Sequence, residues 1–299
     1  MMKEKQLIVI VGPTAVGKTA LAISLAQRHK TEIISADSRQ IYRELEIGTA
    51  KPTPKELSAV RHHFINSQSI IEEYDAGQFG REALERIHHL FQHHEKIVLC
   101  GGSGLYVKAV TEGFDEMPEV PEGVREGIVR NYQEKGLAWL HQQLEEADPD
   151  YFASVDQQNP QRLMRALELS LATRKPMATL RKASKLQHPF QVLKIGLELE
   201  REELYSRIDQ RMDAMIEHGL FDEAAKLYPQ RHLNALQTVG YREIFDFIDG
   251  LYDRDEAIRL LKRNSRRYAK RQFTWFKKDK EITWFTPDSA LAIRKFIEG

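Results

Sequence analysis

A glycine-rich stretch near the start of the chain has the residue types and spacing of a phosphate-binding loop. It fits the pattern G-x-x-x-x-G-K-[ST] at every restricted position, with the residues Gly12, Pro13, Thr14, Ala15, Val16, Gly17, Lys18 and Thr19. Glycines let the backbone curl until its N–H groups converge on phosphate oxygens, and the helix that follows adds partial positive charge. Lys18 would neutralise the phosphates and the Thr19 hydroxyl would ligate Mg²⁺. The stretch therefore predicts a grip on a magnesium-bound phosphate chain.

This loop alone does not decide the reaction, because kinases, nucleoside triphosphatases and switch proteins all carry it. The next strong strand pattern, Ile97–Cys100, leads into a glycine turn and not into an acidic pair. The carboxylate that positions Mg²⁺ and water in an ATPase is therefore missing there. The chain also lacks the Asn/Thr-Lys-x-Asp stretch that reads guanine, which argues against a GTP switch.

Asp37 follows the second strand pattern, Glu32–Ala36. Ligands of open α/β sheets bind at the carboxyl ends of the strands, so Asp37 is expected to face the same crevice as the phosphate loop. There it could accept a proton or a hydrogen bond from a nucleophile. It could equally cap a helix that starts at Ser38. The sequence leaves both roles open.

A second glycine turn, Gly101–Gly104, follows the strand pattern Ile97–Cys100 and precedes a helical pattern from Leu105. It could form another anion-binding nest in which the Ser103 hydroxyl reaches the ligand. A tight structural turn is the alternative.

The stretch Arg259–Lys280 is strongly basic, with ten Lys and Arg residues, one Asp and hence a net charge of +9 in a chain of net charge zero. Arg259, Arg263, Arg266 and Lys270 have the spacing of one helix face, and aromatic residues are interleaved. Such a stripe is typical of a surface that binds a nucleic-acid backbone. A solvated helix face is the alternative.

Weaker signals lie elsewhere. Arg162 and Arg165 share a helix face and could track phosphates or form surface salt bridges. His89 and His93 have zinc-compatible spacing, but no acidic or cysteine partner is suitably spaced. Cys100, the only cysteine, excludes a disulfide framework and is expected to pack in the core.

Short apolar runs indicate the strands that position these residues: Leu7–Val11, Glu32–Ala36, Ile97–Cys100, Val192–Leu197 and Ile282–Phe285. Alternation with helices predicts an α/β fold, a P-loop parallel sheet flanked by helices. Between about 116 and 189 strand patterns give way to helices broken by prolines. We therefore expect a catalytic core of residues 1–115 and 190–299 with an α-helical insertion domain, 116–189. No run has the length of a membrane span, and we expect a cytoplasmic protein.

Together these pieces resemble the tRNA dimethylallyltransferase (tRNA isopentenyltransferase) family, and the bacterial type in particular. The resemblance covers nearly the whole chain and rests on Gly12–Thr19, Asp37–Tyr42, Gly48–Pro52, Gly101–Tyr106, Arg165–Glu168, Val239–Glu243 and Arg267–Phe276. It implies transfer of a dimethylallyl group from dimethylallyl diphosphate to N6 of the adenosine 3′ of the tRNA anticodon. The phosphate loop would then hold the diphosphate with Mg²⁺ as cofactor, and not ATP. The insertion would bind the anticodon stem-loop, and we expect a monomer.

The resemblance also implies residue roles. Asp37 would act as base on the adenine amine, Lys18, Thr19 and Ser103 would lie near the diphosphate and the reacting centre, and Arg211 would clamp the diphosphate. The expected tRNA contacts are Asp37, Ser38, Arg39, Gln40, Arg125, Gln161, Arg162, Leu163, Met164, Arg165, Gln237, Thr238, Val239, Gly240, Tyr241 and Arg242, besides the basic-stripe residues Arg266 and Lys270.

The chain departs from the family pattern in two places. Ser103 stands where many members have Thr, which preserves the hydroxyl, and Arg174 stands where Gly is frequent. Three alternatives remain at this stage: a small-metabolite kinase, a nucleotide-dependent RNA-binding module without catalysis, and an enzyme that prenylates free adenine nucleotides. The first and third do not account for the basic stripe.

Overall fold

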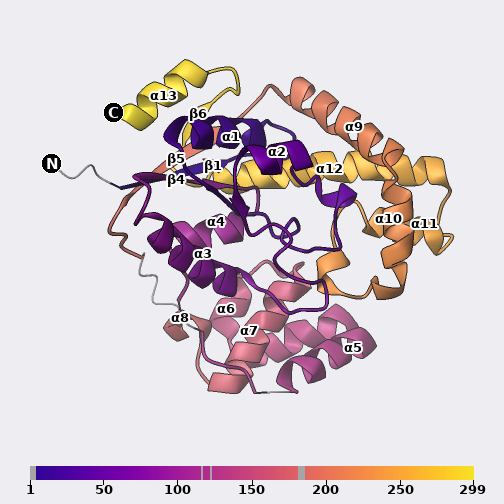
Figure 1. Cartoon of the computed structure of the whole chain (residues 1–299). Coiled ribbons are helices and arrows are strands. Elements are labelled where there is room, and N and C mark those ends of the chain that lie inside the picture. Colours follow the sequence, from indigo (N-terminus) through magenta and orange to yellow (C-terminus); the bar gives the residue numbers. More distant parts are fainter. Residues whose placement is uncertain (1–4, 116, 122, 181–185) are drawn as a thin grey trace. The chain divides into compact units, whose positions relative to one another are not determined.

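The computed structural model describes residues 5–115, 117–121, 123–180 and 186–299. By its internal contacts the chain divides into two compact units (Figure 1). The larger one comprises the residues up to Gly113 together with Gln187–Gly299, and the smaller one is Phe114–Leu186.

The larger unit is built on one parallel sheet. Its strands are β1 (Gln6–Val11), β2 (Ile33–Ser35), β3 (His62–His63), β4 (Lys96–Cys100), β5 (Gln191–Leu197) and β6 (Thr283–Phe285). They lie in the order β3-β2-β4-β1-β5-β6, and every neighbouring pair is parallel. The predicted α/β class is confirmed, and the five expected strands are all present within a residue or two of their expected bounds. The edge strand β3 was not predicted, because two histidines carry no apolar run.

Helices cover both faces of this sheet. The helices of this unit are α1 (Lys18–His29), α2 (Pro54–Ala59), α3 (Ala76–Leu90), α4 (Gly104–Thr111), α9 (Arg201–Glu217), α10 (Leu220–Leu227), α11 (Arg242–Ile248), α12 (Arg254–Phe276) and α13 (Ala290–Glu298), with short 3₁₀ turns η1 (Ile47–Thr49), η2 (Tyr228–Gln230) and η3 (Asn234–Leu236). The helices α3 and α4 pack on one face, and α1, α9 and α13 pack on the other (Figure 1).

The central strand β1 shows why its sequence is apolar throughout. Alternate residues of a strand point to opposite faces. Leu7 and Val9 accordingly join the core under α3 and α4, whereas Ile8 and Ile10 join the core under α1. Every one of these side chains is fully buried. A strand covered on both faces reads as a continuous apolar run, as parallel sheets require.

The smaller unit is helical and has its own core. It contains α5 (Val124–Ala147), α6 (Pro149–Ser154), α7 (Pro160–Thr173) and α8 (Met177–Leu180). Leucines of α5 and α7 form the centre of that core. The buried Asp148 carboxylate accepts hydrogen bonds from the Tyr151 amide at 3.1 Å and the Met177 amide at 2.7 Å, and so joins the starts of α6 and α8. Within the described residues, no helix is long and apolar enough to cross a membrane.

Candidate active site

The phosphate loop joins β1 to α1, and two glycines make its path possible. Gly12 has φ +143°, and a Cβ there would lie 2.6 Å from the Leu197 carbonyl oxygen. Gly17 has φ +104° and immediately precedes α1. Side chains are strained in this backbone region, so the sharp turn needs glycine at both positions.

A cavity of about 380 Å³ opens in front of this loop. It is lined, among others, by these residues singled out from the sequence: Thr14, Ala15, Gly17, Lys18, Thr19, Asp37, Arg39, Gln40, Arg211, Thr238, Val239 and Gly240. Segments from both ends of the chain thus meet at the carboxyl ends of β1 and β2. By contrast, Pro13 and Val16 are buried beneath the loop and shape it without lining the cavity.

Lys18 is the cation closest in sequence to the turn. Its Nζ donates to the Pro13 carbonyl at 2.7 Å, which holds the side chain folded back over the loop. Burial lowers the pKa of Lys18 from 10.5 to about 8, although the neighbouring Cys100 and Asp37 side chains act in the opposite direction. A bound phosphate would favour the charged form again.

Arg211 reaches the same cavity from α9. Its Nη2 donates to the Thr14 hydroxyl at 2.5 Å, so it touches the phosphate loop directly. Burial lowers its pKa, and the Asp37 charge counteracts this effect. Two partly buried cations therefore face one cavity, and an anionic ligand with several charges would relieve the cost of burying them.

Asp37 lies after β2 and uses one carboxylate oxygen to shape the chain. Its Oδ1 accepts hydrogen bonds from the Arg39 amide at 2.9 Å and the Gln40 amide at 3.2 Å. The segment that follows is a turn and not a helix, so the helix-capping alternative is wrong in that detail. Its Oδ2 has no hydrogen-bond partner in the described part of the chain. One oxygen thus fixes the turn, while the other remains available to a ligand.

The second glycine turn packs beside Asp37. A Cβ on Gly101 would lie only 2.0 Å from the Ala36 carbonyl oxygen, so the close approach of the two turns needs glycine. Ser103 Oγ accepts a hydrogen bond from the Ser38 amide at 2.9 Å and donates to the Ser38 hydroxyl at 3.1 Å.

Ser38 and Ser103 line a second cavity, of about 460 Å³. Its walls carry the aromatic residues Tyr42, Tyr74, Tyr106, Tyr268 and Trp275. The two cavities have Arg39, Gly102, Tyr268 and Gln272 in common. Asp37 lines the first cavity and its neighbour Ser38 lines the second, so the two spaces meet at this turn.

Gln272 of α12 joins the two glycine turns, and sequence reasoning gave it no role. Its Oε1 accepts a hydrogen bond from the Thr14 amide at 2.8 Å, and its Nε2 donates to the Gly102 carbonyl at 2.9 Å. Its helical spacing from apolar residues could have indicated this role. The buried residues of α12 are Ala257, Leu261, Ser265, Ala269, Gln272 and Phe276. A large amide on a buried helix face needs specific partners.

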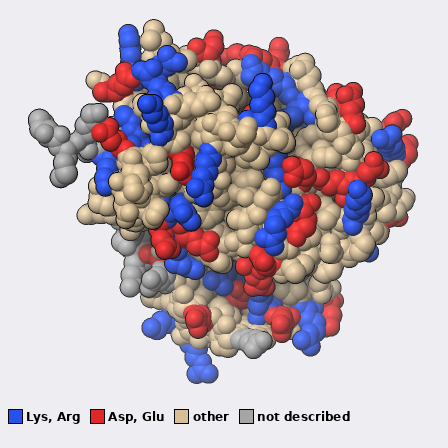
Figure 2. Space-filling view, viewed as in Figure 1, with Lys and Arg blue, Asp and Glu red and all other residues tan. Residues whose placement is uncertain are grey.

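Several residues of the basic stripe form ion pairs with acidic residues, which the sequence did not indicate. Arg266 forms a bidentate pair with Asp209 of α9, with both contacts at 2.6 Å. Further pairs join Arg259 to Glu256, Lys262 to Asp213 and Lys277 to Glu198. Figure 2 likewise shows basic and acidic side chains interspersed over the visible face. The expected open stripe that includes Arg259 and Arg266 is thus corrected, because acids distant in sequence neutralise part of it.

Four exposed basic residues of α12 have no ion-pair partner among the described residues: Arg254, Arg267, Lys270 and Arg271. The Arg271 guanidinium lies 5.7 Å from the centre of the Tyr268 ring, and both residues line the second cavity. Arg267, Lys270 and Arg271, which lie within two turns of α12, form a free positive surface that borders the site through Arg271.

In the helical unit, some of the residues expected to contact tRNA are exposed and others are buried. Gln161 and Arg162 are exposed, whereas Leu163 and Met164 are buried in the unit's own core. The Leu163 and Met164 side chains therefore pack inside, which corrects their expected role as contacts. They lie on the apolar face of α7.

Arg125 and Arg165 share one acidic partner, Glu168, whose side chain is 1% exposed. Arg125 contacts Oε1 at 2.6 Å and Arg165 contacts Oε2 at 3.1 Å. Both guanidiniums are about half exposed and the trio has a net charge of +1. This is a preformed arginine pair.

The residues of the stretch 237–242 also differ in their exposure. Thr238, Val239 and Gly240 line the first cavity, Tyr241 is fully buried, and Gln237 and Arg242 are exposed. The Tyr241 side chain therefore supports the site from behind, and the expectation that it contacts tRNA is corrected.

The site fits Mg²⁺ only together with a ligand. No group of three His, Cys, Asp or Glu residues among the described residues could hold a metal ion by itself. Thr19 lines the first cavity, and its hydroxyl has no hydrogen-bond partner in the described part of the chain. Because Mg²⁺ binds readily to few protein ligands plus substrate phosphates, one hydroxyl beside two cations suits a magnesium–diphosphate.

Fold and site together define a P-loop α/β protein whose glycine-rich loop faces one cavity, with an aromatic second cavity beside it. The family model described as IPP transferase matches residues 40–279. A tRNA dimethylallyltransferase of Cytophaga hutchinsonii is 53% identical over 295 residues, which cover 99% of this chain and 97% of that protein. The chain therefore belongs to the IPP transferase family, whose curated relatives are tRNA dimethylallyltransferases.

Solved structures of proteins with related names are also similar to this chain. The tRNA isopentenylpyrophosphate transferase of Bacillus halodurans is 40% identical with a TM-score of 0.73, and the match covers 99% of this chain and 96% of that one. A eukaryotic dimethylallyltransferase acting on tRNA is 26% identical with a TM-score of 0.77, covering 95% of this chain and 75% of that one.

Proposed function

We propose that the protein transfers the dimethylallyl group of dimethylallyl diphosphate to N6 of the adenosine on the 3′ side of a tRNA anticodon. The observation that carries this proposal is the meeting of the two cavities at Asp37 and Ser38. One cavity has the phosphate loop and the other has aromatic walls. Such a pair suits a reaction in which a diphosphate and a base approach one point from different spaces.

The first cavity would hold the diphosphate. Loop amides, Lys18 and Arg211 face it and would stabilise the negative charge that grows on the leaving group as the allylic C–O bond breaks. Mg²⁺ held between the Thr19 hydroxyl and diphosphate oxygens would supply further charge neutralisation. The chain's own part is to bind and orient the leaving group.

The second cavity would hold the target adenine. A base must leave its stack before an enzyme can modify it, and aromatic side chains such as Tyr106 and Trp275 offer surfaces on which it can stack. Its volume of about 460 Å³ is ample for a nucleobase. The exocyclic amine would then lie at the turn that carries Asp37.

Asp37 would complete the reaction. A bond forms between adenine N6 and the allylic carbon, the C–O bond to the diphosphate breaks, and the proton from N6 passes to the free Oδ2 of Asp37. The Oδ1 contacts with Arg39 and Gln40 would keep the carboxylate in place throughout.

The tRNA backbone would be bound by the free positive residues. Arg271 lines the second cavity, and Arg267 and Lys270 lie within one turn of it on α12. The Arg125–Arg165 pair offers a second phosphate contact on the helical unit. We expect the reaction in the cytoplasm, with the protein a monomer.

The test is to measure diphosphate release with dimethylallyl diphosphate and Mg²⁺, with and without unmodified tRNA, in the absence of ATP. Release that requires tRNA supports the proposal. ATP turnover with a phosphorylated small product would support a kinase, and tight tRNA binding without any release would support a non-catalytic RNA-binding module.

A further inference from the structure

The loop from Glu46 to Lys51 forms a wall of the phosphate-loop cavity, but none of its residues has a place in the chemistry above. Gly48, Thr49 and Ala50 line the cavity. The loop contains the single 3₁₀ turn η1, so its own hydrogen bonds cannot fix its position. Something outside the loop must hold it.

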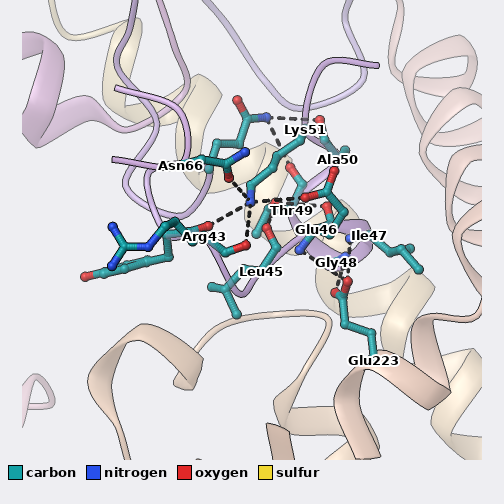
Figure 3. A network of polar contacts seen from close by, with 12 residues as sticks. Arg43, Leu45, Glu46, Ile47, Gly48, Thr49, Ala50, Lys51, Asn66 and Glu223 are labelled. Atoms are coloured by element: carbon teal, nitrogen blue, oxygen red, sulfur yellow. Dashed lines mark hydrogen bonds and ion pairs between the residues drawn. The ribbon is translucent and has the colours of Figure 1, made fainter. Parts of the chain in front are cut away.

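Glu223 of α10 holds one side of this loop. Its Oε2 accepts hydrogen bonds from the Ile47 amide at 2.7 Å and the Glu46 amide at 3.2 Å, and its Oε1 accepts one from the Gly48 amide at 2.9 Å (Figure 3). Three successive backbone N–H groups thus converge on one carboxylate. Hydrogen bonds to an ionised acceptor are stronger than neutral ones.

The other side of the loop is held from the catalytic turn. Gln40 Nε2 donates to the carbonyl oxygens of Thr49 at 3.1 Å and Ala50 at 3.0 Å, and the Gln40 amide donates to Asp37 Oδ1. Lys51, whose side chain is 2% exposed, donates to the Asn66 side chain at 2.5 Å (Figure 3).

Glu223 also fixes a second wall segment through Tyr241. The Tyr241 hydroxyl donates to Glu223 Oε1 at 2.6 Å. The ring packs so tightly on Gly48 that a Cβ there would lie 2.5 Å from the ring carbon Cζ. Because Tyr241 directly follows the cavity-lining Thr238–Gly240, one carboxylate sets the position of both segments.

We infer that Glu223 is a positioning residue for the part of the cavity that receives the prenyl diphosphate. The inference rests on the proposed function. Ala50 and Val239, on the two segments that Glu223 fixes, line this cavity together with Met212 and Met215, and their apolar surfaces suit a five-carbon allylic group. Neither wall segment lines the second cavity. Loss of the carboxylate therefore weakens use of dimethylallyl diphosphate and leaves tRNA binding intact.

The direct test is the variant Glu223→Gln, compared with Asp222→Asn. Asp222 is the exposed neighbour on the same helix turn, so its variant removes the same charge without touching the loop. Glutamine replaces one carboxylate oxygen by an NH2 group, which cannot accept a hydrogen bond from a loop N–H. Hydrogen exchange of the amides of residues 46–48 should therefore accelerate about tenfold in Glu223→Gln, the loss of one hydrogen bond to a charged group. Exchange in Asp222→Asn should match the parent.

The kinetic readout separates positioning from mere stability. In Glu223→Gln the KM for dimethylallyl diphosphate should rise about tenfold, with the Kd for tRNA within about twofold of the parent. A purely structural role would lower the active fraction, and hence the apparent kcat, without changing this KM. An unchanged KM in folded variant protein with fast-exchanging loop amides overturns the inference and leaves the proposed function standing. If the parent itself makes no product, the proposed function fails instead.

If Glu223→Gln does not fold, Tyr241→Phe provides the same test. It removes one hydrogen bond to Glu223 and keeps the ring against Gly48. The expected rise in the KM for dimethylallyl diphosphate is about threefold, the effect of one modest hydrogen bond. No change in this KM contradicts the inference.

Discussion

Gln272 Oε1 accepts a hydrogen bond from the Thr14 amide at 2.8 Å, although the two residues are 258 positions apart. The same side chain donates to the Gly102 carbonyl. A helix near the end of the chain therefore sets the spacing between the phosphate loop and the second glycine turn. The contact matters because both cavities have Gln272 in their walls.

The variant Gln272→Met preserves side-chain length and removes both hydrogen bonds. The partly buried Thr14 amide and the buried Gly102 carbonyl lose their partners, so the free energy of unfolding should fall by about 2 kcal/mol. The KM for dimethylallyl diphosphate should rise about tenfold because the Thr14 segment is released. Denaturant unfolding and steady-state kinetics measure the two effects. Thr274→Val, an exposed change on the same helix, is the control; equal behaviour of both variants would refute the bridging role.

The variant Asp37→Asn separates the two uses of this side chain. Asparagine keeps an oxygen that accepts from the Arg39 and Gln40 amides, so the turn should survive. The proton acceptor is lost, and kcat should fall about 100-fold or more. Binding of tRNA should stay within about twofold, since phosphate contacts dominate its affinity. Parent-like kcat in the variant would show that Asp37 only shapes the turn.

The pH dependence of diphosphate use should report Lys18. Its pKa of about 8 means that the free protein loses this charge as the pH rises above 8. The KM for dimethylallyl diphosphate should therefore increase above about pH 8, by up to tenfold per pH unit. In Lys18→Arg the charge persists, so this break should vanish. A break shared by both proteins would instead belong to the substrate or another group.

The lowered pKa of Lys18 also makes the free energy of unfolding depend on pH. The folded pKa of about 8 lies below the ordinary 10.5, so the unfolded chain binds more protons between these two pH values. The contribution of Lys18 to the free energy of unfolding therefore increases as the pH rises from 8 to 10.5. Below pH 8 both states carry the charge and its burial counts fully against folding. Comparison of parent and Lys18→Met unfolding across this range isolates the contribution.

The free positive surface of α12 should carry salt-dependent tRNA binding. The double variant Arg267→Gln, Lys270→Gln should weaken tRNA binding and make the slope of log K against log salt shallower by about 1.5, as expected for two phosphate contacts. The matched control, Arg259→Gln with Lys277→Gln, removes two cations that already have acidic partners. A control slope as shallow as that of the double variant would show that position on the helix is irrelevant.

The sequence predicted the positions of some site residues better than those of others. Lys18, Thr19 and Asp37 could be placed because a local motif and strand ends determine where they lie. Arg211 was placed only through the family resemblance, and the structure brings it to the same cavity.

Two of the misses depend on contacts between distant segments. The pairing of Arg266 requires Asp209 on another helix, and the clamp formed by Glu223 requires a loop 176 residues away. Helix periodicity could have warned that Leu163 and Met164 face a core, since both lie on the apolar face of α7. The family resemblance assigned every residue of 161–165 to tRNA contacts, without separating the buried face of the helix from the exposed one.

The central claim is tested most directly by mapping the product on tRNA. Two unmodified transcripts, with adenosine or guanosine on the 3′ side of the anticodon, would be incubated with the protein, dimethylallyl diphosphate and Mg²⁺ but no ATP. Mass spectrometry of nuclease fragments and nucleosides should find N6-dimethylallyl adenosine at that position in the first transcript and no product in the second. An unmodified first transcript, with folded protein that binds it, would contradict the account.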